Sequence, residues 1–333
     1  MSSTPSTADS VAALAARFRA AEALPLAPDA STRLFARLRF AAGGTAVAMI
    51  DAAGGAAALD RMAAANELLT GVGVPVPRIL DRDDALSALL FEDAGDTLLA
   101  DALPRLSADA RRRVYERAAR IAARIGLAGT PLLDGAHPLS RPQLGRPRLR
   151  WELSLFATHD VAARRGEVDW ALFSELGRFF DHLCDGLTLG TAELAHRDFH
   201  ARNLMLAANG GLVVVDYQDA LLAPVHYDVA SLLRDPYVEP DAALSKAAAA
   251  AYAAERGGPA DLEADPDFAL AALQRDLKAI GTYASQARLL GRERFLASIP
   301  AAERLARRAL PALPLDLRDE ARRLLDRLRF AAG

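Results

Sequence analysis

The sequence predicts an α+β protein with two lobes: a small mixed sheet with one or two helices over residues 1–92, and a mostly helical lobe over residues 93–333. Three observations lead to this prediction. A chain of 333 residues is long enough for two packed subdomains. Short extended runs separated by glycine and proline turns occur before residue 93. After it, apolar residues recur every three or four positions, which is the spacing of helices that bury one face.

The expected N-terminal elements follow from apolar spacing and turn residues. Val11, Leu14 and Phe18 recur at helical spacing behind Ser10, a residue type that often caps a helix. The pair Gly43-Gly44 separates two extended runs, as a hairpin turn requires. In order, we expect a helix from residue 10, two strands within residues 32–51, a helix over 59–69, a break at the glycines and prolines of 71–77, and strands over 78–82 and 85–92.

The expected C-terminal elements are helices, with one exception. Ser107 is a suitable cap for a helix whose apolar residues from Val114 to Ile125 follow at steps of four, three and four. Residues 128–148 are rich in proline and glycine and predict a loop. A long helix follows, with one apolar face made of Trp170, Phe173, Leu176, Phe180, Leu183 and Leu187. The exception is the segment 195–220, which contains the residues that we assign to the chemistry.

The charge balance and the apolar content exclude several kinds of partner. The chain has 40 basic and 43 acidic residues and a formal net charge of −3, so we expect no nucleic-acid binding. No stretch reaches the roughly 20 apolar residues of a membrane span and no secretory signal begins the chain, so we expect a cytoplasmic protein without membrane contact. Cys184 is the only cysteine, which excludes an internal disulfide and predicts a buried apolar role.

Lysine is almost absent from the chain. Only Lys246 and Lys278 are lysines, so 38 of the 40 basic residues are arginine. Together with alanine runs such as Ala247 to Ala251, this composition is typical of a GC-rich genome. We therefore expect a mechanism that needs no lysine.

The segment 195–220 predicts a hairpin with polar residues at its open end. An apolar stub, Leu204 to Leu206, and an apolar strand, Leu212 to Val215, flank a turn at Asn209-Gly210-Gly211. If the two strands pair, Asn203 before the first and Asp216 after the second lie side by side. Oxygen ligands of this kind suit Mg²⁺, which water and phosphate oxygens complete.

Acidic and histidine residues near this hairpin have further expected roles. Asp198, just upstream, is positioned to accept a hydroxyl proton. Asp228 begins a helix, and we expect it to brace the loop by accepting backbone N–H bonds rather than to act in catalysis. His196 and His200 are four residues apart, but no third zinc ligand is evident, and we expect His196 to support the loop instead.

One motif in this segment resembles the catalytic loop and metal site of protein kinases: His196-Arg197-Asp198, followed by Asn203 and then by Asp216. It equally resembles the small-molecule relatives of those kinases, the kinase-like aminoglycoside phosphotransferase superfamily. Within it, the segments around 196–205 and 213–233 look most like the bacterial anomeric N-acetylmuramate/N-acetylglucosamine 1-kinases. Further similar segments are Asp29 to Arg33 (an opening hairpin), Leu90 to Asp96 (a hinge), Trp151 to Phe156 (a substrate-side helix), and Lys278 to Gly281 with Arg294 to Leu296 (C-terminal helices).

The resemblance implies a protein-kinase-like bilobal fold and ATP-dependent, Mg²⁺-assisted transfer of a phosphoryl group to the C1 hydroxyl of a free amino sugar, in cell-wall recycling. It implies a small-molecule partner, and we expect a monomer. By position, the implied roles are Asp198 for the acceptor hydroxyl, Asn203 and Asp216 for the metal, Ser31, Phe91, Glu92 and Asp93 for the nucleotide, and Glu152, His200, Arg202 and Asp219 for the sugar.

The chain departs from the wider kinase pattern at the phosphate-binding lysine. The strand expected to hold it, residues 46–51, contains no basic residue, and no Gly-x-Gly-x-x-Gly loop precedes it. Arginines 33, 37 or 39 of the neighbouring strand are candidates to replace it, since arginine binds phosphate with two parallel hydrogen bonds. We favour Arg33 and Arg37, because residues four apart on a strand face the same side.

Two alternatives to the sugar kinase remain open at this point. One is another small-molecule kinase, such as an aminoglycoside phosphotransferase, whose polycationic substrate calls for an acidic pocket. His200 and Arg202, taken as cationic groups beside the catalytic loop, favour an acidic sugar instead. The other is a pseudokinase that binds a nucleotide without catalysis, which the complete set of Asp198, Asn203 and Asp216 disfavours.

Overall fold

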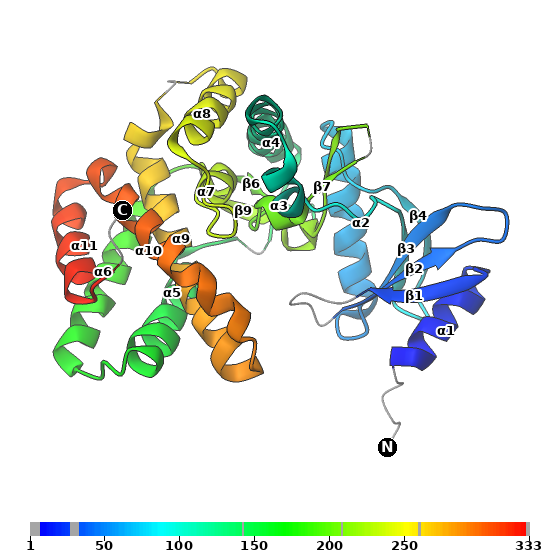
Figure 1. The fold of residues 1–333 in the computed structure, drawn as a ribbon, viewed down its shortest axis with the longest axis horizontal. Coiled ribbons are helices and arrows are strands. Elements are labelled where there is room, and N and C mark those ends of the chain that lie inside the picture. The colour runs from blue at the N-terminus through cyan, green and yellow to red at the C-terminus, as the bar shows by residue number, and fades with distance from the viewer. Residues whose placement is uncertain (1–6, 27–32, 142, 208, 259–260, 331–333) are drawn as a thin grey trace. The chain divides into compact units, whose positions relative to one another are not determined.

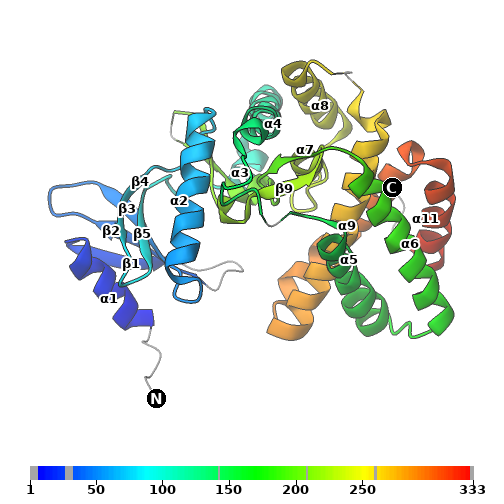
Figure 2. The ribbon, with the colours of Figure 1, turned by 180° about the vertical axis from the view of Figure 1, so that it is seen from behind.

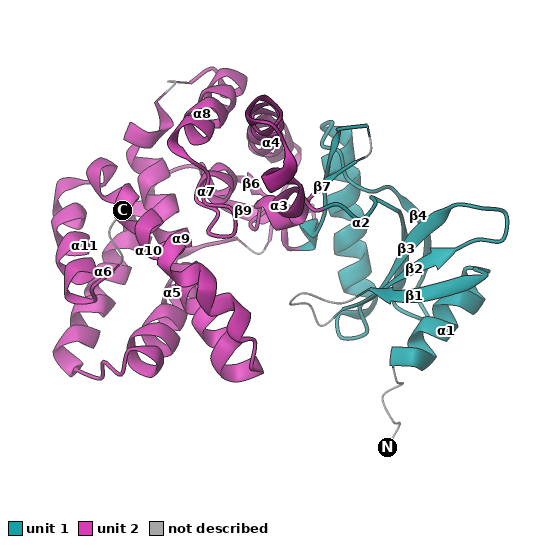
Figure 3. Ribbon diagram, in the orientation of Figure 1, with its two compact units in different colours: residues 1–97, 205–218 teal, residues 98–204, 219–333 magenta. Residues whose placement is uncertain are grey.

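The structure is a computed structural model that describes residues 7–26, 33–141, 143–207, 209–258 and 261–330. The chain divides into two compact units (Figure 3). Unit 1 contains the residues up to Thr97 together with Met205–Gln218, and unit 2 contains Leu98–Leu204 and the residues from Asp219 onward. The chain first passes from unit 1 to unit 2 after Thr97, a few residues beyond the boundary expected between 92 and 93. The return of 205–218 to unit 1 was not expected.

Unit 1 is built on a five-stranded sheet in the order β1-β2-β3-β5-β4, in which every pairing is antiparallel. The sheet is therefore small, as expected, but not mixed. The elements of unit 1 are α1 (Thr7–Arg17), β1 (Glu22–Leu26), β2 (Leu34–Arg39), β3 (Thr45–Ile50), α2 (Gly55–Gly71), β4 (Ile79–Asp83) and β5 (Ala88–Glu92), followed by the returning hairpin strands β7 (Leu204–Leu206) and β8 (Leu212–Val214).

Four of the five strands and both helices of unit 1 were predicted, with two differences. Helix α1 begins at Thr7, so Ser10 lies inside the helix and is not its cap. Strand β1 was missed, because its sequence contains Pro25 and shows no alternation of buried and exposed residues. Proline is tolerated at the edge of a sheet, which is where β1 lies.

The two faces of the sheet have different partners. On one face, alternate residues of β2, β3 and β5, among them Leu38, Ala48 and Leu90, form a core with Val11 and Leu14 of α1. Figures 1 and 2 show α1 lying along this sheet. The period of two in a strand turns the intervening residues to the other face, where a cavity described below is found.

Hydrogen bonds between residues that are far apart in the sequence hold the returning hairpin to the rest of unit 1. The backbone N–H of Leu206 donates to Thr97 O at 2.8 Å, and that of Val214 donates to Pro75 O at 2.7 Å. Strands β7 and β8 pair as predicted. Beyond them, the Asn66 side-chain amide donates to the Tyr217 hydroxyl at 2.6 Å, so the end of the hairpin is also anchored on α2.

Unit 2 is mostly helical, as predicted. Its main elements are α3 (Leu99–Ala102), α4 (Ala108–Gly129), α5 (Arg146–Leu155), the π-helix η3 (Phe156–Arg164), α6 (Trp170–Leu189), β6 (Ala192–Ala195), β9 (Leu221–Pro224), α7 (Tyr227–Leu233), α8 (Ala242–Arg256), α9 (Pro266–Leu290), α10 (Ile299–Ala309) and α11 (Leu315–Arg327). Strands β6 and β9 pair antiparallel. No helix within the described ranges is long and apolar enough to cross a membrane.

Local predictions for unit 2 were mostly correct. Ser107 caps α4, and its hydroxyl accepts a hydrogen bond from Ala110 N–H. Cys184 is fully buried in α6, where burial raises the pKa of its thiol to about 12. The expected apolar face of α6 was wrong at one position, because Trp170, the first residue of the helix, is 86% exposed.

Helix α9 is the long central helix of unit 2 and contacts α5, η3, α7 and α10 (Figures 1 and 2). It lies close to another backbone at Gly281, where a Cβ atom would clash with Phe156 N and lie 2.7 Å from the carbonyl carbon of Leu155. Glycine is therefore required at this position for α9 to lie against the junction of α5 and η3.

We expect Gly281→Ala to destabilise the protein by about 1–3 kcal/mol, because a methyl group overpacks this backbone contact. Gly71→Ala is the matched control, since Gly71 is also helical and a Cβ there meets nothing within 4 Å. Urea denaturation of both variants checks the prediction. Equal stability of the two variants would contradict it.

Candidate active site

The loop 196–203 connects β6 to β7 and contains five of the predicted site residues, namely His196, Asp198, His200, Arg202 and Asn203. Its Arg197 has φ of 82°, a left-handed conformation that is costly for a residue with a side chain. His196 is fully buried and packs edge-to-face against Phe199, with 5.7 Å between ring centres. His196 thus packs within the loop, and its supporting role stays a prediction.

Asp228 holds the start of this loop. Its two carboxylate oxygens accept hydrogen bonds from the backbone N–H groups of His196, at 2.7 Å, and Arg197, at 2.9 Å. The bracing contact predicted from the sequence is therefore present. Burial raises the pKa of Asp228, while the nearby His196 and the two N–H bonds act in the opposite direction.

Asp235 is a second buried brace, which the sequence did not reveal. It accepts hydrogen bonds from the backbone N–H groups of Ala201 and Tyr237, both at 2.9 Å. Burial raises its pKa to about 6. The two carboxylates thus fix the loop at both ends, Asp228 before Asp198 and Asp235 after it.

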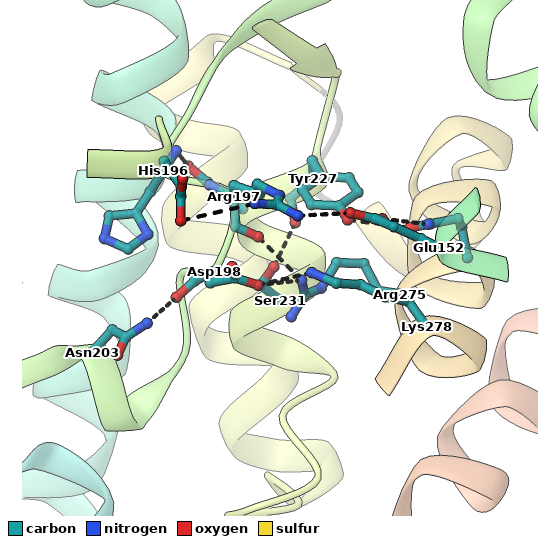
Figure 4. A network of polar contacts seen from close by, with 12 residues as sticks. Glu152, His196, Arg197, Asp198, Asn203, Tyr227, Ser231, Arg275 and Lys278 are labelled. Carbon is teal, nitrogen blue, oxygen red and sulfur yellow. Dashed lines mark hydrogen bonds and ion pairs between the residues drawn. The ribbon is translucent and has the colours of Figure 1, made fainter. Parts of the chain in front are cut away.

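Asp198 lies between these braces and is bound by two cations from α9. Its Oδ1 accepts hydrogen bonds from Lys278 Nζ at 2.9 Å and from Arg275 Nη1 at 3.2 Å. Figure 4 shows Arg275 and Lys278 approaching Asp198 from one side and Asn203 from the other. Burial alone would raise the pKa of Asp198, but the charges of Lys278, Arg275 and Arg197 outweigh it and hold that pKa well below its usual range.

Lys278 corrects the expectation that no lysine takes part in the site. One of the two lysines of the chain forms an ion pair with the carboxylate that we assign to the acceptor hydroxyl. The sequence contained a signal for it, because a lysine stands out in a chain that otherwise uses arginine. The separation of 80 positions between Asp198 and Lys278 gave no means of pairing them.

Glu152 belongs to the same network of buried charges. Its carboxylate accepts hydrogen bonds from Arg197 Nη2 at 2.8 Å and from the Gln274 side-chain amide at 3.0 Å (Figure 4). Glu152 is 1% exposed, whereas its neighbour Trp151 is 57% exposed. Both Glu152 oxygens thus accept hydrogen bonds from protein donors, and the ion pair with Glu152 orients Arg197. A direct contact between Glu152 and the sugar stays a prediction.

The other expected sugar-binding residues have distinct surroundings in unit 2. Burial lowers the pKa of His200 to about 3, so its ring is neutral near pH 7 and does not supply the positive charge that we expected. The Arg202 guanidinium lies over the Tyr237 ring, 4.5 Å from its centre. Asp219 has an exposed side chain, 3.9 Å from Arg197 Nη1.

The predicted metal ligands are oriented by hydrogen bonds within their own units. In unit 2, the Asn203 amide nitrogen donates to Asp198 O at 2.8 Å, which leaves the amide oxygen available as a ligand. In unit 1, Asp216 has φ of 64°, and its Oδ1 accepts from the Gln218 amide at 2.6 Å. An amide oxygen and a carboxylate fit a hard cation such as Mg²⁺. Their joint binding of a metal stays a prediction.

Unit 1 contains a cavity of about 220 Å³ on the face of the sheet opposite α1. Apolar side chains dominate its wall, among them Phe35, Val47 and Phe91, and residues 92–95 form part of its rim. A slot of this composition suits a flat aromatic ring with polar groups at its edge. The cavity therefore includes the three expected nucleotide residues Phe91, Glu92 and Asp93.

Both arginines expected at the phosphates are bound to carboxylates of unit 1. Arg33 Nε lies 2.8 Å from Asp51 Oδ2. Arg37 also lines the cavity, pairs with Asp93 at 2.7 and 3.0 Å, and contacts Asp96. These pairs orient the guanidinium groups, and their contact with phosphate stays a prediction. Ser31 lies outside the described residues.

Residues 22–265 match the model of the phosphotransferase enzyme family. This chain belongs to that family. The phosphotransferase is 33% identical to the N-acetylmuramate/N-acetylglucosamine kinase of Pseudomonas aeruginosa, over 84% of this chain and 81% of that protein. It is 30% identical to the protein of the same name from Neisseria meningitidis, over 64% of this chain and 61% of that protein. The family membership expected from the sequence is confirmed.

Solved structures share the fold of this phosphotransferase. A choline/ethanolamine kinase family protein from Mesorhizobium loti has a TM-score of 0.64 at 15% identity, over 96% of this chain and 99% of that chain. The GDP complex of aminoglycoside 2'-phosphotransferase-IIIa has a TM-score of 0.60 at 16% identity, over 88% of this chain and 96% of that chain. At these identities the likeness shows the fold alone, and it confirms the expected protein-kinase-like class.

We expect Asp228→Asn to lower both the stability and the activity of the phosphotransferase. The amide can accept from one backbone N–H but turns its own donor toward the other, which leaves a buried donor unpaired at a cost of about 1–3 kcal/mol. Thermal denaturation and phosphoryl-transfer assays measure the two effects. Asp109→Asn, an exposed acid in the first turn of α4, is the control and should change neither. An Asp228→Asn variant of wild-type stability would contradict the bracing role.

Proposed function

We propose that this phosphotransferase is an ATP-dependent kinase for the anomeric C1 hydroxyl of N-acetylmuramate, N-acetylglucosamine or both, acting in peptidoglycan recycling. The observation that carries the proposal is Asp198, a carboxylate with one oxygen held by two cations and the other open to an acceptor. The similarity to the P. aeruginosa protein, which extends over most of both chains, supports the sugar. We further propose a monomeric cytoplasmic enzyme.

The acceptor chemistry follows from the state of Asp198. Its depressed pKa keeps it ionised near neutral pH, so it accepts a hydrogen bond from the acceptor hydroxyl. The hydroxyl oxygen then forms a bond to the γ-phosphorus while the bond from that phosphorus to the β,γ-bridging oxygen breaks, and ADP leaves with the electron pair. The hydroxyl proton passes to Asp198 or to water. Because such transition states are loose, orienting the hydroxyl contributes more than deprotonating it.

The nucleotide is proposed to bind to unit 1. The metal is proposed to be bound by Asn203 and Asp216. The apolar cavity would accept adenine, with hydrogen bonds from the backbone near Phe91 to Asp93. Bound Mg²⁺ would neutralise charge on the ATP phosphates. Asn203 would offer its amide oxygen, and Asp216 its carboxylate.

The sugar is proposed to bind in unit 2 beside Asp198. Candidates for its hydroxyl, acetamide and carboxylate groups are the half-buried Arg202, the exposed Asp219, His200 and the buried Glu152. A site that reads polar substituents through hydrogen bonds discriminates strongly against analogues that lack them.

The proposal predicts ADP release when the protein is incubated with Mg-ATP and either N-acetylmuramate or N-acetylglucosamine, and a product phosphorylated at C1. A coupled ADP assay measures turnover and phosphorus NMR locates the phosphate. An aminoglycoside such as kanamycin serves as the competing acceptor. Consumption of the aminoglycoside with no turnover of either amino sugar would reject the assignment.

Asp198→Asn is the matched catalytic control for this assay. It should lower kcat by about 10²–10⁴-fold, because the amide accepts the hydroxyl hydrogen bond poorly and takes no proton. ATP binding, measured by calorimetry, should be unchanged. A variant with near-wild-type kcat would remove Asp198 from its proposed role.

The proposed phosphate role of arginine predicts weaker ATP binding for Arg33→Ala and Arg37→Ala. Each replacement removes a guanidinium that unit 1 holds in place through Asp51 or Asp93. Arg39→Ala is the control on the same strand, since Arg39 is exposed and pairs only with Glu22 in the described ranges. Calorimetric titration with ATP compares the three variants. Wild-type affinity in both Arg33→Ala and Arg37→Ala would refute the arginine hypothesis.

A further inference from the structure

Lys278 has an unusual environment for a lysine. Its side chain is only 14% exposed, and the single hydrogen bond that it makes to the described residues is to Asp198 Oδ1, at 2.9 Å. The ammonium has three donors, so two have no protein partner there. Buried polar groups are normally satisfied by the protein or by solvent. Among the described residues, Asp198 is therefore the hydrogen-bond partner through which Lys278 can act.

The two carboxylate oxygens of Asp198 differ in their hydrogen bonds. Lys278 and Arg275 both donate to Oδ1, whereas no hydrogen bond from the described residues reaches Oδ2. The Asp198 side chain is 33% exposed, so its unshared oxygen is the one available to an acceptor. Two donors on one oxygen fix the rotation of the carboxylate, because turning it would break both hydrogen bonds.

Arg275 and Lys278 are not equivalent in this arrangement. The Arg275 guanidinium also donates to Arg197 O at 3.1 Å and lies over the Tyr227 ring, 5.3 Å from its centre, so it is anchored in the network. Lys278 makes no second hydrogen bond to the described residues. A compact ammonium fits beside a guanidinium on one oxygen more easily than a second planar guanidinium does. This difference gives a physical reason for a lysine at 278 in an arginine-rich chain.

We propose that Lys278 is a positioning residue for phosphoryl transfer, which occupies Oδ1 of Asp198 and so presents Oδ2 to the acceptor hydroxyl. The inference rests on the proposed kinase function but not on the identity of the sugar. Lys278 acts through Asp198 on whichever hydroxyl is phosphorylated. The spacing of α9 supports this placement, because Arg275 and Lys278 are three residues apart and share one face of the helix.

A purely structural ion pair has a different signature from a positioning contact. Removing one partner of a buried structural pair chiefly lowers stability, since it leaves the other charge uncompensated. Asp198 still has Arg275 when Lys278 is removed, so its charge remains compensated. We therefore expect the loss of Lys278 to appear in kcat much more than in thermal stability or in ATP binding.

The test compares Lys278→Met, which removes the charge at similar length, with Lys278→Arg, which keeps it. We expect Lys278→Met to lower kcat by about tenfold or more, with the KM for ATP within about twofold of wild type. Lys278→Arg should recover only part of the loss, because a second planar guanidinium fits beside Arg275 less well than the ammonium does. Lys246→Met is the matched control, because Lys246 is the other lysine of the chain and lies exposed on α8.

A double variant shows whether Lys278 acts through Asp198. In the Asp198→Asn background, Lys278→Met should add little further loss in single-turnover experiments, because residues that act as a unit are not additive. Independent, multiplicative losses would overturn the proposal. So would a Lys278→Met enzyme with wild-type kcat, or one whose loss is only a raised KM for a carboxylate-bearing sugar, which would assign Lys278 to substrate recognition.

The assays use the acceptor that the wild-type enzyme phosphorylates, chosen from the two amino sugars and kanamycin. If neither amino sugar is turned over, the proposed substrate fails while the comparison of Lys278 variants continues on the aminoglycoside. A wild-type enzyme inactive on all three acceptors would overturn the proposal together with the kinase function on which it rests. Thermal denaturation of every variant separates loss of positioning from loss of fold.

Discussion

The hydrogen bonds from two consecutive backbone N–H groups to the buried carboxylate of Asp228 fix the start of the loop 196–203. Arg197 pays about 1–2 kcal/mol for its left-handed backbone, whereas each hydrogen bond to a charged group contributes about 1.5–3 kcal/mol. The two bonds therefore outweigh the strain. With this backbone fixed, Arg197 extends to Glu152 and Asp198 is directed to the cations of α9.

The acceptor side of the site is a group of charges that stabilise one another. Glu152 and Asp198 are the anions, and Arg197, Arg275 and Lys278 are the cations. Taking such charges out of water is costly unless each is paired and hydrogen-bonded. The network pairs each of these charges with an opposite one, using side chains from α5, the loop and α9. The packing of these three elements and the charge balance of the site therefore depend on each other.

Features set by nearby residues could be predicted from the sequence, and features set by distant residues could not. The Ser107 cap and the hairpin at Gly210 depend on a few neighbouring residues, and the motif around Asp198 gave the family. The pairing of Asp198 with Lys278 and the brace from Asp235 arise only when α7 and α9 pack against the loop. No local pattern encodes such packing. Strand β1 was missed for a related reason, since an edge strand is defined by its neighbour rather than by its own alternation.

The hairpin of β7 and β8 has a consequence for the order in which the protein is made. It completes unit 1 with residues 205–218, and Tyr217 provides a partner for Asn66 of α2. A ribosome synthesises the N-terminal sheet long before these residues emerge. During that interval unit 1 lacks this hairpin and the wall of its cavity that contains Met205 and Val215. Unit 1 therefore becomes complete only after more than half of the polypeptide has been translated.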